Sequence, residues 1–176
     1  MNEFKILNGR IVEKLFLIVW PPWGEAHFSD IDISFGFVFK NEPDKLYKVS
    51  VDKDELWSPR IWVEPLPDFN YSWEDFYNRM KKWMNAKDDT LIFGLEYYEV
   101  TKSDLFSTIV GSEIVKVELI SVSGNSEPFG AKIYFEDDFI ISLPNSDGNI
   151  VETSKFNKND SINWFNKLGE VIYLKL

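Results

Sequence analysis

The sequence predicts an α+β fold in which a mostly antiparallel, twisted sheet of about eight strands packs against one main amphipathic helix. Short β-branched and aromatic runs alternate with turn residues along most of the 176 positions. One segment near the middle instead places apolar residues at helical spacing. Neither an internal repeat nor a Gly/Ser-rich or Pro-rich stretch divides the chain, so we expect residues 1–176 to form a single globular domain.

The N-terminal part is expected to supply a strand followed by a β-hairpin. Residues 11–20 are largely β-branched and aromatic, and Pro21 with Pro22 ends the run by removing two backbone donors. In residues 30–39 every second side chain is apolar, which places five of them on one face: Ile31, Ile33, Phe35, Phe37 and Phe39. The turn residues 41–44 then lead into the second strand of the hairpin, residues 46–52.

The main helix is predicted over residues 73–86. Its apolar residues recur at spacings of three and four: Trp73, Phe76, Tyr77, Met80, Trp83 and Met84. Ser72 is placed to cap the first turn, and Asp75 is placed to reach back in a shortened capping box. We expect the apolar stripe to pack on the sheet.

The second half is predicted to be mainly strands, with two short helices. The strands are expected at 91–100, 114–122, 131–136, 139–143, 150–153 and 170–176. One short helix begins at 101–104 and is closed by Gly111, and another is capped by Asp160 and ended by Gly169. In the last strand, Val171, Tyr173 and Leu174 are expected to be buried.

Composition excludes several classes of function. Twenty-nine acidic against nineteen basic residues give a formal net charge of −10, which disfavours binding to nucleic acids and to anionic membrane surfaces. Cysteine is absent, which excludes disulfides, thiolate zinc sites and a cysteine nucleophile. Because no long apolar run is present, we expect no signal peptide and no membrane span. The lack of cysteine favours a cytoplasmic location, and no cofactor is expected because no cofactor-binding motif is present.

One short motif suggests metal chemistry. In residues 28–34, Asp30 and Asp32 share one strand face, an arrangement in which two carboxylates can hold Mg²⁺ against a phosphate. The string Ser29 to Asp32 resembles the signature of polymerase-β-like nucleotidyltransferases, and the resemblance implies a divalent-metal-dependent enzyme that uses both aspartates. That family places a Gly-Ser pair before them, which this chain lacks, and Asp52 is the candidate for a third carboxylate.

His27 is the only histidine, so a histidine-dependent triad or metal cluster has one position at which to form. A general base also needs an orienting partner and a nucleophile, and the sequence specifies neither. We therefore expect no catalytic role for it.

The leading hypothesis is a non-catalytic acidic binding protein, such as a bacterial immunity-type protein or inhibitor that neutralises a basic partner like a nuclease toxin. An acidic surface accelerates encounter with a cationic protein, and exposed aromatic residues supply anchors. The expected partner-binding residues are six acids and two tryptophans: Glu96, Glu99, Asp104, Glu136, Asp137, Asp138, Trp57 and Trp62. A third hypothesis is a structural or adaptor subunit that pairs through a sheet edge or an aromatic patch.

Overall fold

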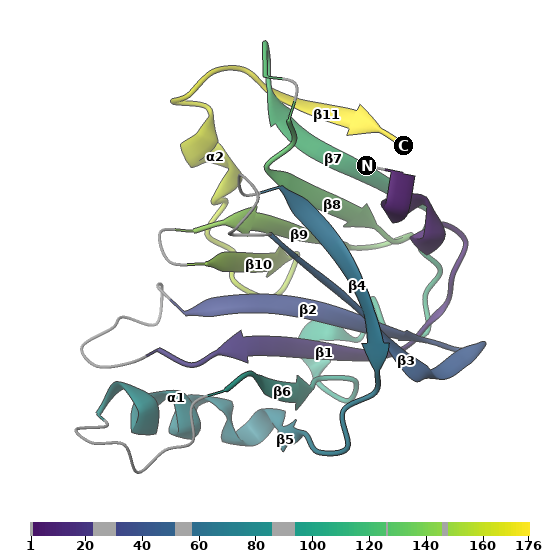
Figure 1. Ribbon diagram of the computed structural model, residues 1–176, viewed down its shortest axis with the longest axis vertical. Helices are drawn as coiled ribbons and strands as arrows, with labels where there is room; N and C mark the ends of the chain where they lie inside the picture. The colour runs from purple at the N-terminus through teal and green to yellow at the C-terminus, as the bar shows by residue number, and fades with distance from the viewer. Residues whose placement is uncertain (1, 23–30, 52–57, 86–93, 126, 146–147) are drawn as a thin grey trace.

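The computed structural model describes residues 2–22, 31–51, 58–85, 94–125, 127–145 and 148–176. It confirms the α+β class, with eleven strands in the described ranges instead of about eight. The strands form two sheets, and the helices are short (Figure 1). In the described ranges, no helix is long and apolar enough to cross a membrane.

The first sheet has six strands in the order β4-β3-β2-β1-β6-β5. Their bounds are β1 Val12–Trp20, β2 Asp32–Phe39, β3 Glu42–Val51, β4 Pro59–Pro65, β5 Tyr71–Ser72 and β6 Glu96–Glu99. All neighbours are antiparallel except β5 and β6, which pair in parallel over two residues. The predicted hairpin is therefore present as β2 and β3, and β4 extends it by a strand that the sequence did not indicate.

The second sheet is an antiparallel arrangement of five strands in the order β10-β9-β8-β7-β11. Its strands are β7 Lys116–Val122, β8 Gly130–Tyr134, β9 Phe139–Pro144, β10 Asn149–Thr153 and β11 Val171–Lys175. The expected burial of Tyr173 is wrong, since this side chain is 41% exposed. Tyr173 is paired with Ile120 on the outer face, whereas Leu174 packs against the main core.

The main core lies between the two sheets. In Figure 1, β4 crosses in front of the second sheet while β10 runs beside β2. The alternating side chains of β2 all enter this core, as predicted, and so do inward residues of the second sheet such as Leu119 and Ile133. A separate cluster around Ile120, Ile141, Leu143 and Phe165 covers part of the outer face of the second sheet.

The predicted main helix is a 3₁₀ turn, η3 Trp73–Asp75, that continues as α1 Phe76–Met84. Phe76, Met80 and Trp83 are its buried residues, in agreement with the predicted stripe. The predicted capping box is wrong. The Ser72 hydroxyl donates to the carboxylate of Glu74, and neither Ser72 nor Asp75 makes a side-chain cap, since the tighter first turn uses its own backbone bond.

The remaining helical segments are η1 Asn2–Leu7, η4 Asp104–Phe106 and α2 Ile162–Phe165. Within the predicted opening segment 101–104, Ser103 caps η4 and accepts from the amide of Leu105. For α2 the N-cap position is Ser161, and the predicted Asp160 contributes its backbone carbonyl, which accepts from Asn163.

Candidate binding site

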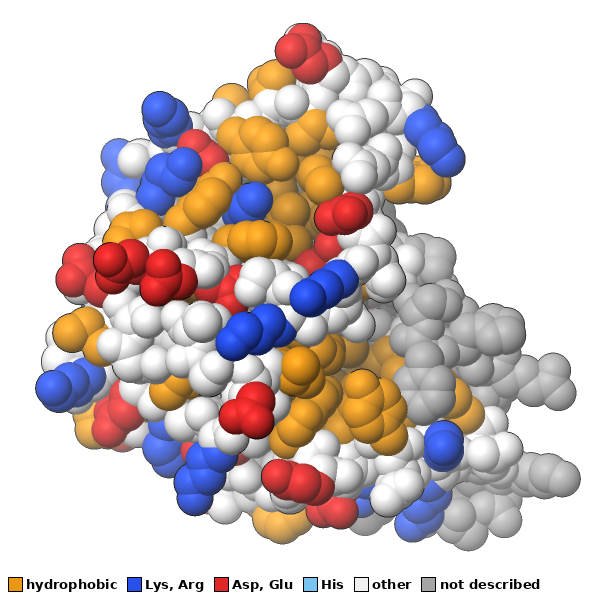
Figure 2. Space-filling model, turned by 180° about the vertical axis from the view of Figure 1, so that it is seen from behind, with side chains coloured by type: hydrophobic (Ala, Val, Ile, Leu, Met, Phe, Trp, Pro, Cys, Tyr) orange, Lys and Arg blue, Asp and Glu red, His pale blue; other side chains and the backbone are white. Residues whose placement is uncertain are grey.

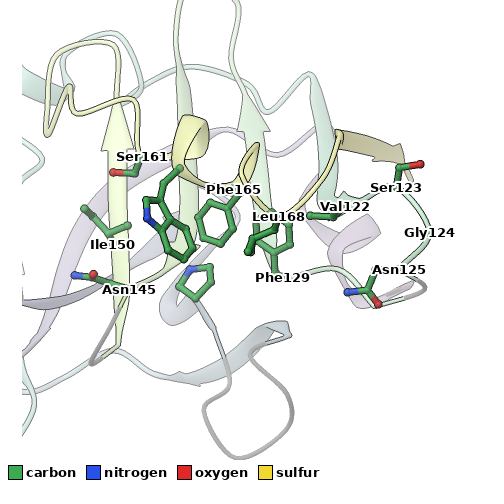
Figure 3. A pocket seen from close by; sticks show the side chains of 12 residues that line it. Val122, Ser123, Gly124, Asn125, Phe129, Asn145, Ile150, Ser161, Phe165 and Leu168 are labelled. Carbon is green, nitrogen blue, oxygen red and sulfur yellow. The ribbon is translucent and has the colours of Figure 1, made fainter.

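An open groove of about 1110 Å³ lies on the outer face of the second sheet, next to α2. Apolar side chains make most of its surface: Val122, Phe129, Pro144, Ile150, Trp164, Phe165 and Leu168. Figure 3 shows Phe129, Phe165 and Leu168 gathered in the middle, with Ser123 and Asn125 at one end and Asn145 and Ser161 at the other. None of the described residues that line it carries a charged side chain.

The helix α2 is held in place by the strand beneath it. Glu152 of β10 is 5% exposed and accepts from the backbone amide of Ser161 at 3.2 Å and from its hydroxyl. Three residues beyond the start of the helix, the ring of Phe165 stacks on Phe129, with centroids 4.3 Å apart and planes at 15°. The helix is therefore fixed to the sheet by a buried carboxylate at one end and by an aromatic stack in its last turn.

The opposite wall of the groove is a loop that follows β7. The Ser121 hydroxyl is fully buried and lies 3.2 Å from the carbonyl oxygens of Asn125 and Glu127. The amide of Ser123 donates to the carbonyl of Glu170 at 2.8 Å. Gly169 has φ +152°, and a Cβ at this position would collide with Val122, so glycine is required where the chain leaves α2.

Two of the predicted partner-binding acids, Glu136 and Asp137, are exposed in the turn between β8 and β9. The third acid of this turn, Asp138, is only 6% exposed and accepts from the Thr108 hydroxyl, the Phe139 amide at 2.7 Å and the Ser154 amide at 3.0 Å. Asp138 therefore does not belong to the exposed surface that we expected, because its carboxylate is used inside the protein.

The Thr108 hydrogen bond has a second effect. It places the turn beside the segment that begins with the exposed Asp104, another predicted residue. We call Asp104, Glu136 and Asp137 the acidic ridge. Two bases lie near it. Lys102 is exposed two positions before Asp104, and Lys155 Nζ is 3.2 Å from Ser107 Oγ and 3.5 Å from the Asp104 carbonyl oxygen. Figure 2 shows several acidic side chains gathered on one flank of the face that carries the groove region.

Glu96 lies in the interior instead of on the expected surface. It is 4% exposed, and its carboxylate accepts from Arg79, from Trp83 Nε1 at 2.9 Å and from the Tyr98 hydroxyl. Burial by itself would raise the pKa of the Glu96 carboxyl, but the hydrogen bonds outweigh it and hold the pKa below its ordinary value. Arg79 and Trp83 of α1 and Tyr98 of the same strand occupy the carboxylate. Glu96 therefore has little exposed surface with which to contact a binding partner.

The other predicted residues are placed as follows. Glu99 is half-buried, with Oε2 3.8 Å from Lys14 Nζ. Trp62 is 37% exposed on β4, and the Lys48 ammonium lies 5.4 Å from its ring centre. Trp62 thus belongs to the first sheet, whereas Glu136 and Asp137 belong to the second. Trp57 lies outside the described residues.

The possible metal site can be followed only at Asp32, because Asp30, Asp52 and His27 lie outside the described residues. The Oδ1 atom of Asp32 accepts from the backbone amide of Asn149 at 2.8 Å. In the ranges that the structure covers, no three or more His, Asp or Glu side chains form a group that could hold a metal ion.

Comparison with known proteins returns no relative of this chain. No family model matches it, and no curated protein or solved structure is significantly similar.

Proposed function

We propose that the protein is a non-catalytic binding protein that neutralises a basic protein partner, as a bacterial immunity protein neutralises a toxin domain such as a nuclease. The net charge of −10 supports this proposal, because an acidic field raises the rate of encounter with a cationic surface. The observation that carries it is the hydrogen bond from Thr108 to Asp138, which brings the segment of Asp104 next to the turn that contains Glu136 and Asp137.

The ridge is favourable for binding because its supporting residue is buried. Asp138 accepts from the Phe139 amide of the turn and ties the turn to the Ser154 amide and the Thr108 hydroxyl, while Glu136 and Asp137 remain exposed. A rigid turn loses little conformational entropy when a partner binds. Carboxylates presented in this way can occupy a cationic cleft that otherwise accepts phosphates, and such blocking requires no catalytic chemistry by this chain.

The test compares two double variants that remove the same charge from different places. Glu136→Gln with Asp137→Asn changes the ridge, and Asp44→Asn with Asp68→Asn changes two exposed acids of the first-sheet side of the chain. The immobilised full-length protein is used to capture partners from the lysate of its source at low and high salt, with identification by mass spectrometry. Association rates are then measured with the purified partner.

We expect one basic protein to be retained at low salt and the ridge variant to associate about ten-fold more slowly, with a weaker salt dependence. The control variant should associate at nearly the wild-type rate. Equal rates for both variants would remove the ridge from the proposal, and the absence of any basic protein at low salt would contradict the proposed function.

A further inference from the structure

We infer that the groove beside α2 is an anchor site for the basic partner, and that it takes an aromatic or branched aliphatic side chain from a segment flanked by Lys or Arg. The class of partner rests on the proposed function, but the site is a different one. Neither the acidic ridge nor its charge determines whether the groove binds.

The surface of the groove has the chemistry of an interaction site. Trp164 is 56% exposed and Leu168 is 63% exposed, and both lie beside the stacked pair of Phe129 and Phe165. Contiguous exposed apolar surface bordered by polar residues is typical of an interaction site, and tryptophan is enriched among the residues that dominate binding energy. Figure 2 shows hydrophobic side chains gathered in a hollow of the upper half of the molecule.

Exposed charged residues adjoin the lining of the groove in sequence. The described lining residues are uncharged, yet Glu127, Asp160 and Glu170 are exposed within two positions of lining residues along the chain. Glu170 is also tied to the lining by the bond from the Ser123 amide to its carbonyl. One base, Lys167, lies equally close in sequence. Among the described, exposed charged residues that adjoin the lining in sequence, acids therefore outnumber bases by three to one, which complements an apolar side chain with basic neighbours.

The groove is already formed in the free protein. Its two walls are fixed by buried groups, the Glu152 carboxylate under α2 and the Ser121 hydroxyl under the loop after β7. Little ordering is then needed on binding, which favours affinity.

The groove and the acidic ridge lie at opposite ends of the same strands. The groove includes Phe129 and Pro144, which lie at the ends of β8 and β9 that are far from their connecting turn. The acidic ridge includes that connecting turn. Five residues of β8 at about 3.3 Å each separate the two by about 16 Å, a span that one partner of ordinary interface size can cover.

The experiment uses defined peptides instead of an unidentified partner. Three capped peptides are titrated into the ¹⁵N-labelled full chain: one with Phe between pairs of lysines, one with Ala in place of Phe, and one with Glu in place of every Lys. We expect the Phe/Lys peptide to bind about ten-fold more tightly than the Ala peptide, since a buried aromatic side chain contributes roughly that factor. Its amide shifts should concentrate at Gly124, Phe129 and Leu168.

Two groove variants and one control complete the design. Leu168→Lys and Trp164→Ala should each weaken the Phe/Lys peptide by about ten-fold, whereas Phe69→Ala, at a side chain that is 65% exposed elsewhere, should not. Binding of the Glu peptide as tight as that of the Phe/Lys peptide would overturn the assigned charge, since Lys116 and Lys132 also lie on this outer face.

Two further outcomes separate this inference from the proposed function. Shifts that map to Glu136 and Asp137 and persist in Leu168→Lys would overturn the groove assignment and leave the acidic ridge as the binding surface. If no peptide binds, the groove inference fails, while capture of a basic protein that depends on the ridge would still support the proposed function.

Discussion

The backbone amide of Asn149 donates to Oδ1 of Asp32 at 2.8 Å, although the two residues are 117 positions apart. The fully buried side chain of Asn149 adds two bonds, donating to the Ile33 carbonyl at 2.7 Å and accepting from the Ser142 hydroxyl at 2.8 Å. Gly148 permits the approach, because a Cβ there would collide with Asp32. One asparagine therefore joins β9 and β10 of the second sheet to β2 of the first.

Asn149→Ala is expected to lower the free energy of unfolding by about 2–6 kcal/mol, since two buried groups lose their partners at about 1–3 kcal/mol each. Urea denaturation measures the change. Asn78→Ala, at an exposed position of α1, is the control and should be neutral or slightly stabilising, because alanine favours a helix. A loss below about 0.5 kcal/mol for Asn149→Ala would mean that the sheets are joined mainly by apolar contacts.

Local patterns in the sequence predicted most elements of the fold. The alternation in residues 31–39 identified the buried face of β2, and the spacing of Phe76, Met80 and Trp83 identified the buried face of α1. The strand β4 was missed because Pro59 and Pro65 at its ends are typical of a loop, although prolines are tolerated on an edge strand. Alternation and helical spacing report only which face a single element buries.

The buried polar residues could not be predicted in this way. Glu96 was expected at the surface because its partner Arg79 lies 17 residues earlier on a helix, and no local pattern pairs the two. Asn149 belongs to a stretch of turn residues, and its partners come from two other strands. Satisfaction of a buried polar group depends on tertiary contacts.

The groove beside α2 left a partial signal in the sequence. Ile162 and Phe165 pack on the sheet, yet Trp164 and Leu168, four positions apart, extend the apolar character to the other side of the same short segment. Only one side of such a short segment can pack on the sheet, so apolar residues on the other side remain exposed. The walls of the groove, by contrast, depend on strands far away in the sequence.

Glu96 and Glu99 provide a direct test of a buried against a half-buried charge on one strand. Glu96→Ala leaves Arg79 without its buried partner and removes the acceptor of Trp83 and Tyr98, so the free energy of unfolding should fall by about 3–5 kcal/mol. Glu99→Ala, at a half-buried residue with a 3.8 Å ion pair, should cost less than about 1 kcal/mol. Similar losses for the two variants would contradict the structural role that we assign to Glu96.

Alkaline pH is expected to destabilise the protein through the half-buried Tyr97 and the buried Tyr98. Burial, followed by the charge of Glu64, raises the pKa of Tyr97 to about 12. Burial and the hydrogen bond to Glu96 raise the pKa of Tyr98 further. An unfolded tyrosine has a pKa of about 10, so between these values the unfolded chain releases protons that the folded protein keeps. The stabilisation is complete below about pH 10 and is lost as the pH rises through the folded values.

Lys132 has the opposite effect, because burial lowers its pKa and stability therefore increases as the pH rises towards the unfolded lysine pKa of about 10.4. Above that pH, Lys132 causes no further change in the free energy of unfolding. The free energy of unfolding, measured by urea denaturation from pH 9 to about pH 12, should therefore fall steadily above about pH 10.5. Tyr97→Phe should make this decline shallower, and Tyr77→Phe, which removes a phenol that is 53% exposed, serves as the control. Equal slopes for wild type and Tyr97→Phe would show that Tyr97 ionises as readily in the folded protein as in the unfolded chain.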